Sequence, residues 1–130
     1  MHAQLDSFTI MVVDDSATVR HAVDTCLTEH GMKVVGFEDG FVALANVVEI
    51  QPDLIFLDTD MPRLDGFQTC TLLKNNPRFH HVPVIMLSFN YSPFEQAKSR
   101  LAGAEDFVIK PFGQVELLHV IQQYLSSSVE

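Results

Sequence analysis

The chain has 130 residues, a length typical of one domain, with 47% hydrophobic and 19% charged residues. That composition supports a globular core and argues against intrinsic disorder. The net charge of −9, without a run of Lys or Arg, argues against nucleic-acid or anionic-membrane binding and favours protein partners. No apolar stretch approaches transmembrane length, and the first residues carry no signal-peptide pattern. We therefore expect one cytoplasmic domain over residues 1–130, with a core of about residues 8–126.

Five short apolar runs alternate with segments whose apolar residues recur at helical spacing. The runs are rich in β-branched and aromatic residues, as strands buried on both faces are, and cover residues 9–13, 33–37, 54–57, 84–87 and 107–109. The helical stripes fall in residues 19–27, 44–48, 67–73, 94–101 and 118–125. Ser16 is expected to cap the first helix, and Pro93 suits the first turn of the fourth.

Five strand–helix units predict an α/β fold with a doubly wound parallel sheet, because parallel strands need crossover connections and both faces of such a sheet are covered by helices. The strand order 2-1-3-4-5 fits five units. In this order the chain reverses its winding between the first and third strands, and ligands bind outside the carboxyl ends of the strands at such a point.

Polar residues follow four of the five predicted strands immediately. Asp14 and Asp15 follow the first strand, Asp58 the third, Ser88 the fourth and Lys110 the fifth. The parallel arrangement brings these side chains to one edge of the sheet. Three carboxylates within ~4 Å would repel by roughly 4 kcal/mol per pair at an effective dielectric of 20. Either an acid holds a proton or a divalent cation is bound, and of these we favour Mg²⁺ with its oxygen ligands.

This set of residues suits phosphoryl transfer to a carboxylate. Asp58 stands alone at the end of a central strand and is the expected nucleophile, while Asp14 and Asp15 form a metal-binding pair. Lys110 would contact the phosphoryl oxygens as a point charge and Ser88 as a hydrogen-bond donor. Each residue alone has an ordinary structural explanation, such as a helix cap, a solvated lysine or a turn. Their joint placement at four strand ends favours the functional interpretation.

Four motifs, MVVDDS, LDTDMPRLDGF, PVIMLS and FVIKPF, occur in an order and spacing similar to those of response-regulator receiver domains. These CheY-like modules of bacterial two-component signalling accept phosphate on an aspartate. The resemblance implies a flavodoxin-like (βα)5 fold, Mg²⁺ as cofactor, and a CheA-like histidine kinase as donor. It also implies that the chain is no enzyme beyond its own phosphorylation and dephosphorylation.

The same resemblance assigns individual roles. It makes Asp58 the phosphoacceptor, Asp15 a direct Mg²⁺ ligand and Asp14 its support, and it adds the backbone carbonyl of Asp60 as a further ligand. It implies a cis peptide between Lys110 and Pro111. We also expect Gly66 to serve a backbone geometry that a side chain would obstruct.

Three features of the chain matter against the usual receiver pattern. Phe89 follows the switch residue Ser88, where a small residue is usual, so its ring either narrows access to the site or packs under the next helix. Phe107 takes the switch position on the fifth strand where Tyr is familiar, so the switch is expected to be read through packing. Asp60 and Asn90 occupy the positions that tune phosphate lifetime, which we do not predict from them.

Residues 89–94 hold three aromatics that, with Phe107 and the last helix, are expected to form an output face across the fourth helix, fifth strand and fifth helix. Core packing of these rings is the alternative. Because no output domain follows the last helix, we expect a stand-alone receiver. The stretches PRLDGFQTC, LLKNNPRF and PVIMLS are similar to receivers of chemotaxis-like systems that control type IV pili and twitching motility, although flagellar-motor regulators and phosphorelay shuttles share the chemistry.

Two other functions fit part of the pattern. Asp58 and Asp60 match the DxD motif of haloacid-dehalogenase-like phosphatases, but those enzymes carry this motif on the first strand and normally have a cap domain. A degenerate receiver that only scaffolds protein contacts is the second alternative, and the complete set of site residues argues against it. Cys26 and Cys70 are interpreted as buried apolar residues, and His80 and His81 as surface residues.

Overall fold

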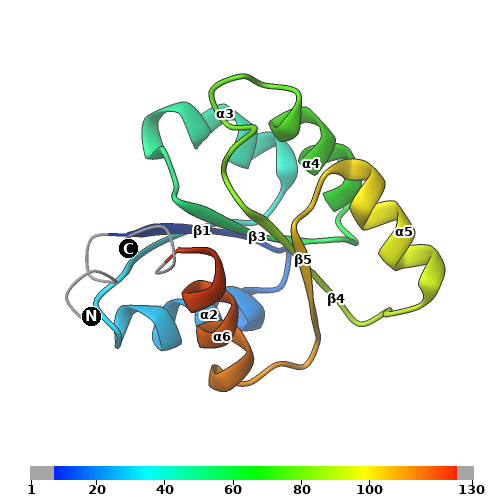
Figure 1. Ribbon diagram of the computed structural model, residues 1–130. Coiled ribbons are helices and arrows are strands. Elements are labelled where there is room, and N and C mark those ends of the chain that lie inside the picture. Colours follow the sequence, from blue (N-terminus) through cyan, green and yellow to red (C-terminus); the bar gives the residue numbers. More distant parts are fainter. Residues whose placement is uncertain (1–7, 126–130) are drawn as a thin grey trace.

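The computed structural model describes residues 8–125, which form a five-stranded parallel sheet with helices on both faces (Figure 1). The strand order is β2-β1-β3-β4-β5, so the predicted fold class and order are confirmed. Within these residues, no helix combines the length and apolarity needed to cross a bilayer. The elements are β1 (Thr9–Val13), α2 (Ala17–Thr28), β2 (Lys33–Phe37), α3 (Gly40–Ile50), β3 (Leu54–Asp58), α4 (Gly66–Lys74), β4 (Val84–Ser88), α5 (Pro93–Ala102), β5 (Asp106–Ile109) and α6 (Gln114–Tyr124).

The sheet divides the core into two layers because successive strand residues point to opposite faces. On β1, Ile10 and Val12 pack in the layer beneath α2 and α6, while Met11 and Val13 pack in the layer beneath α3 and α4. The central strands β1, β3 and β4 are buried on both faces as expected. The edge strands are not: β2 exposes Lys33, and β5 exposes Ile109, because each lacks a neighbouring strand on one side.

The predicted helix starts are confirmed. The Ser16 side chain accepts a hydrogen bond from Val19 N at 3.2 Å, and Pro93 occupies the first turn of α5 after its cap Ser92. Two strands end one residue later than predicted, at Asp58 and Ser88, because the ladders pair Asp58 with Leu87 and Ser88 with Ile109. These two side chains are therefore fixed by the sheet itself.

Gly66 begins α4 directly against the end of β3. Its N–H donates to Thr59 O at 3.1 Å, and a Cβ atom at this position would lie 2.1 Å from Asp58 O and 2.8 Å from Thr59 Cα. Both contacts are with backbone, which cannot move aside as a flexible side chain can. The expected obstruction at Gly66 is thus confirmed, and the bare glycine sets how closely α4 approaches Asp58.

We expect Gly66→Ala to lower the free energy of unfolding by about 2 kcal/mol or more, because the added methyl group overpacks rigid backbone. Gly36→Ala is the matched control, since its Cβ would meet the flexible Arg20 side chain at 3.3 Å, and the Val12 side chain and carbonyl at ordinary contact distances of 3.5 and 3.8 Å. The control should stay within about 1 kcal/mol of wild type. Urea unfolding measures both, and equal stabilities would show that α4 can shift without cost.

Candidate functional site

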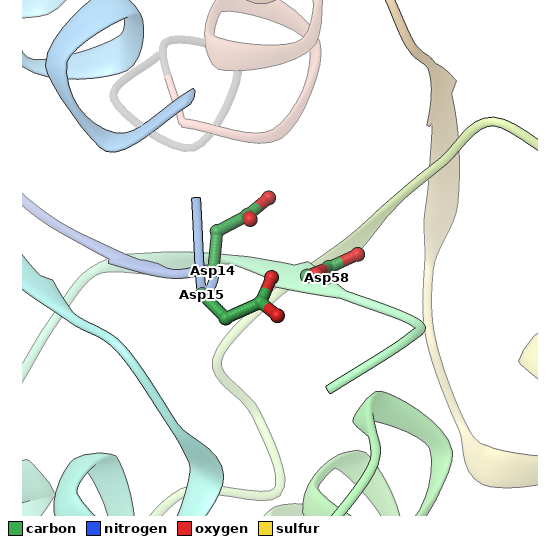
Figure 2. Close-up of side chains that lie close together, drawn as sticks. All are labelled: Asp14, Asp15 and Asp58. Atoms are coloured by element: carbon green, nitrogen blue, oxygen red, sulfur yellow. The ribbon is translucent and has the colours of Figure 1, made fainter. Parts of the chain in front are cut away.

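Three carboxylates gather where β1 and β3 end, as the sequence predicts (Figure 2). Asp14 and Asp15 extend from the end of β1, and Asp58 is the last residue of the adjacent β3. One oxygen from each lies within 4.8 Å of the others. Asp14 is completely buried, Asp58 is 4% exposed, and Asp15 reaches solvent. The site is therefore a buried acidic pair with one open side.

Lys110 joins the two buried acids. Its Nζ lies 2.8 Å from Asp14 Oδ2 and 3.1 Å from Asp58 Oδ1, and its side chain is buried. The peptide between Lys110 and Pro111 is cis, as the resemblance implies. The sequence argument considered only a proton or a dication as compensation for the acids and missed this pairing. Lys110 and Asp58 are 52 positions apart in the sequence, and the packed sheet brings them together.

The protonation of the site follows from burial and from these charges. Burial, together with the nearby Asp14 carboxylate, raises the pKa of Asp58 to about 6, against the opposing effects of Lys110 and the Asp60 N–H. Burial disfavours the charged form of Lys110, but Asp14 and Asp58 outweigh it and hold the pKa of Lys110 above its usual value. Lys110 thus stays an ammonium, while Asp58 gives up its proton only near neutral pH.

The donor atoms of the site fit a divalent cation such as Mg²⁺. All three groups supply hard carboxylate oxygens, which this ion prefers. Within the described residues, Asp14 Oδ2 makes no hydrogen bond despite its burial, because its contact with Lys110 is an ion pair without hydrogen-bond geometry. One ammonium shared between two buried carboxylates leaves negative charge uncompensated, and a bound cation would neutralise it. Asp14, Asp15 and Asp58 are therefore the residues that could hold the ion.

Ser88 and Phe89 lie beside Asp58 at the end of β4. The Ser88 hydroxyl accepts a hydrogen bond from Asn90 N at 3.0 Å and donates to Asn90 O at 3.3 Å, so it is engaged with its own loop. Phe89 is 75% exposed and does not pack under the next helix. Its ring centroid lies 5.3 Å from Lys110 Nζ, so the ring stands beside the site. Of the two interpretations of Phe89, this position favours the one in which the ring narrows access to Asp58.

The other aromatic residues of the expected output face lie at the surface. Tyr91 and Phe94 are exposed, so the core-packing alternative does not apply to them. Phe107 is half-buried, and its ring centroid lies 5.2 Å from that of Tyr91 at an interplanar angle of 56°. This contact links β5 to the loop that follows Ser88.

The cysteine and histidine interpretations are confirmed. Cys26 and Cys70 are free and buried. Burial raises the pKa of the Cys70 thiol to about 11, which leaves it unreactive at neutral pH. His80 and His81 are exposed in the loop before β4.

In metal-free protein, we expect Asp58→Asn to stabilise the fold at neutral pH. The pKa of Asp58 is 3.8 in an unperturbed chain and about 6 when folded, so between these values the folded state binds more protons and its stability falls as pH rises. The free energy of unfolding should rise by about 1 to 3 kcal/mol at about pH 7.5 in a chelator, and the gain should vanish below about pH 4.

Urea unfolding at several pH values measures this difference. Asp24→Asn, on the exposed face of α2, is the control and should change stability by less than about 0.5 kcal/mol. If Asp58→Asn matches wild type in stability at every pH, the raised pKa of Asp58 is wrong.

Comparison with known proteins supports one family. The model of the response regulator receiver domain matches residues 10–122. Protein PilG of Pseudomonas aeruginosa is 45% identical over 98% of this chain and 94% of its own. The chemotaxis protein CheY4 of Vibrio cholerae has a TM-score of 0.87 at 30% identity, over 91% of this chain and 98% of its own.

A third relative bears on the metal. The receiver domain of the sensor histidine kinase PA1611 of Pseudomonas aeruginosa has a TM-score of 0.84 at 25% identity, over 92% of this chain and 98% of its own. Its structure is described with a magnesium ion coordinated in the active site cleft. The site geometry, the sheet order and these matches agree, and the chain belongs to the response regulator receiver domain family.

Proposed function

We propose that Asp58 accepts a phosphoryl group from a histidine kinase in a Mg²⁺-dependent reaction, and that the phosphorylated chain signals by binding another protein. The observation that carries this proposal is the position of Asp58, a buried carboxylate at the end of the central strand, in contact with Lys110 and beside Asp14. Phosphorylation-dependent signalling is the function of the receiver family to which the chain belongs.

The contacts of Asp58 suit nucleophilic attack. Among the described residues, both hydrogen bonds to this carboxylate, from Lys110 Nζ at 3.1 Å and Asp60 N at 3.3 Å, reach Oδ1. The other oxygen keeps its lone pairs for attack on phosphorus. The new P–O bond forms as the P–N bond to the donor histidine breaks, and the ring nitrogen keeps the electron pair. With a pKa of about 6, Asp58 is ionised and nucleophilic slightly above neutral pH.

Two further side chains would stabilise the product. Lys110 can turn its ammonium from the carboxylates to a phosphoryl oxygen, and Ser88 can donate its hydroxyl after leaving Asn90. Bound Mg²⁺, held by Asp14, Asp15, Asp58 and the Asp60 carbonyl, would neutralise negative charge on the phosphoryl oxygens. The magnesium ion described in the PA1611 receiver supports this assignment.

The output face is proposed across α5, β5 and α6. Movement of Ser88 would pull on the loop that carries Tyr91, whose ring contacts Phe107. A cavity of about 460 Å³ lies on this face and is lined by both rings and by Ile109. Exposed apolar surface next to a movable loop suits a protein partner whose affinity depends on phosphorylation.

The pathway is proposed as a chemotaxis-like system that controls type IV pili, with a CheA-like kinase as the donor and a cytoplasmic location. The 45% identity to Protein PilG supports this choice. The family match argues against the haloacid-dehalogenase alternative. The contact of Lys110 with Asp58 argues against a degenerate receiver, because the acceptor and its cation are both in place.

Phosphoryl transfer can be tested with acetyl phosphate and Mg²⁺. We expect wild type to gain one acid-stable, alkali-labile phosphoryl group, and Asp58→Asn to gain none, because the acceptor oxygen is gone. Lys110→Ala should label at least about tenfold more slowly, because it loses a charge-assisted contact worth over 1.4 kcal/mol.

Intact-mass spectrometry measures the labelled fraction. Asp24→Asn, which removes an exposed carboxylate of α2, is the matched control and should label like wild type. Persistent labelling of Asp58→Asn, or an unlabelled wild type, would refute the assignment of the acceptor.

A further inference from the structure

The cavity above Asp58 is strongly acidic. It has a volume of about 270 Å³ and lies between the end of β3, the start of α4 and the loop that leads into α5. Four of its lining residues are acids: Asp58, Asp60, Asp65 and Glu95. Phosphoryl donors are anions, so this lining opposes their approach to Asp58. Lys98 is the only cation among the described residues that line the cavity.

Lys98 is held at this cavity by aromatic rings. Its Nζ lies 4.3 Å from the ring centroid of Phe67 on α4 and 5.5 Å from that of Phe94 on α5. Cation–π contacts at these distances position an ammonium without neutralising it. In the described part of the chain, no carboxylate lies within ion-pair distance of Lys98, although Glu95 lines the same cavity. Its charge therefore remains available to an anion.

Phe67 also places this ammonium near the acceptor. It follows Gly66, whose backbone packs against Asp58 and Thr59. Lys110 cannot serve the same purpose, because it is buried at the base of the site and already paired with Asp14 and Asp58. The two lysines therefore differ in position: Lys110 contacts the acceptor, and Lys98 lines the cavity beside it.

We propose that Lys98 is a specificity-determining residue that draws anionic phosphoryl donors into the acid-lined cavity and favours dianions over monoanions. This inference rests on the proposed phosphorylation of Asp58. Charge attraction acts on the association step, grows with the charge of the donor and weakens in salt. A role in packing alone would show neither dependence.

The test compares Lys98→Met with Arg100→Met, which removes a charge from the exposed face of the same helix and outside the cavity lining. The rate constant for labelling by acetyl phosphate, a dianion at neutral pH, is measured at low ionic strength. We expect it to fall about three- to tenfold in Lys98→Met and less than about twofold in Arg100→Met. In about 1 M salt, Lys98→Met should come within about twofold of wild type.

Two further arms separate charge from packing. Lys98→Arg keeps the charge and the ring contacts, so it should retain at least about half of the wild-type rate. Beryllofluoride is a monoanionic phosphoryl mimic. The rate constant for its binding should therefore fall less in Lys98→Met than the rate constant for labelling by acetyl phosphate. Urea unfolding confirms that each variant is folded before rates are compared.

The outcomes are distinct. If wild type is labelled on Asp58 and Lys98→Met is labelled equally fast, this inference is wrong and the proposed function stands. An equal fall in Arg100→Met, or a fall that persists in high salt, also overturns the role of Lys98. If wild type is not labelled at all, the proposed function itself fails.

Discussion

Two acids buried beside one lysine are the constraint on which the rest of the site depends. Asp14 and Asp58 lie at the ends of adjacent strands, and Lys110 contacts both. With Asp15 at the open side, three carboxylates and one ammonium carry a net charge of −2 when all are ionised. A divalent cation matches that charge. Without such an ion, burial and then the repulsion from Asp14 raise the pKa of Asp58 to about 6.

The fold connects this charged site to an exposed aromatic surface. Ser88 ends the strand next to Asp58, and its hydroxyl is bonded to Asn90 in the loop that leads to α5. That loop carries Tyr91, whose ring packs on Phe107 of β5. A phosphoryl group on Asp58 would offer the Ser88 hydroxyl a charged acceptor that competes with Asn90 O, a neutral one. The proposed signal is therefore a local exchange of hydrogen bonds that alters a nearby aromatic surface.

Sequence reasoning found the strand-end residues because the carboxyl ends of parallel strands share one edge, so apolar runs followed by Asp58, Ser88 and Lys110 suffice to bring them together. It found the obstruction at Gly66 from the family resemblance. It missed what depends on side-chain packing between distant elements: the bridge from Lys110 to Asp14, and the ring contact that holds Lys98 of α5 against α4. It also overestimated the burial of β2 and β5: the predicted order already placed both at the edges of the sheet, but their apolar runs were interpreted like those of the central strands.

The dependence of Mg²⁺ affinity on pH tests the charge balance most directly, because a proton would compete with the proposed metal for Asp58. Isothermal titration calorimetry of the unphosphorylated protein across about pH 5 to 8 measures it. The account predicts a nearly constant Kd above about pH 7 and a Kd that rises towards tenfold per pH unit below about pH 6, where Asp58 holds its proton. A Kd that stays unchanged down to about pH 5 would contradict it, because it would mean that Asp58 is either an ordinary acid or no metal ligand.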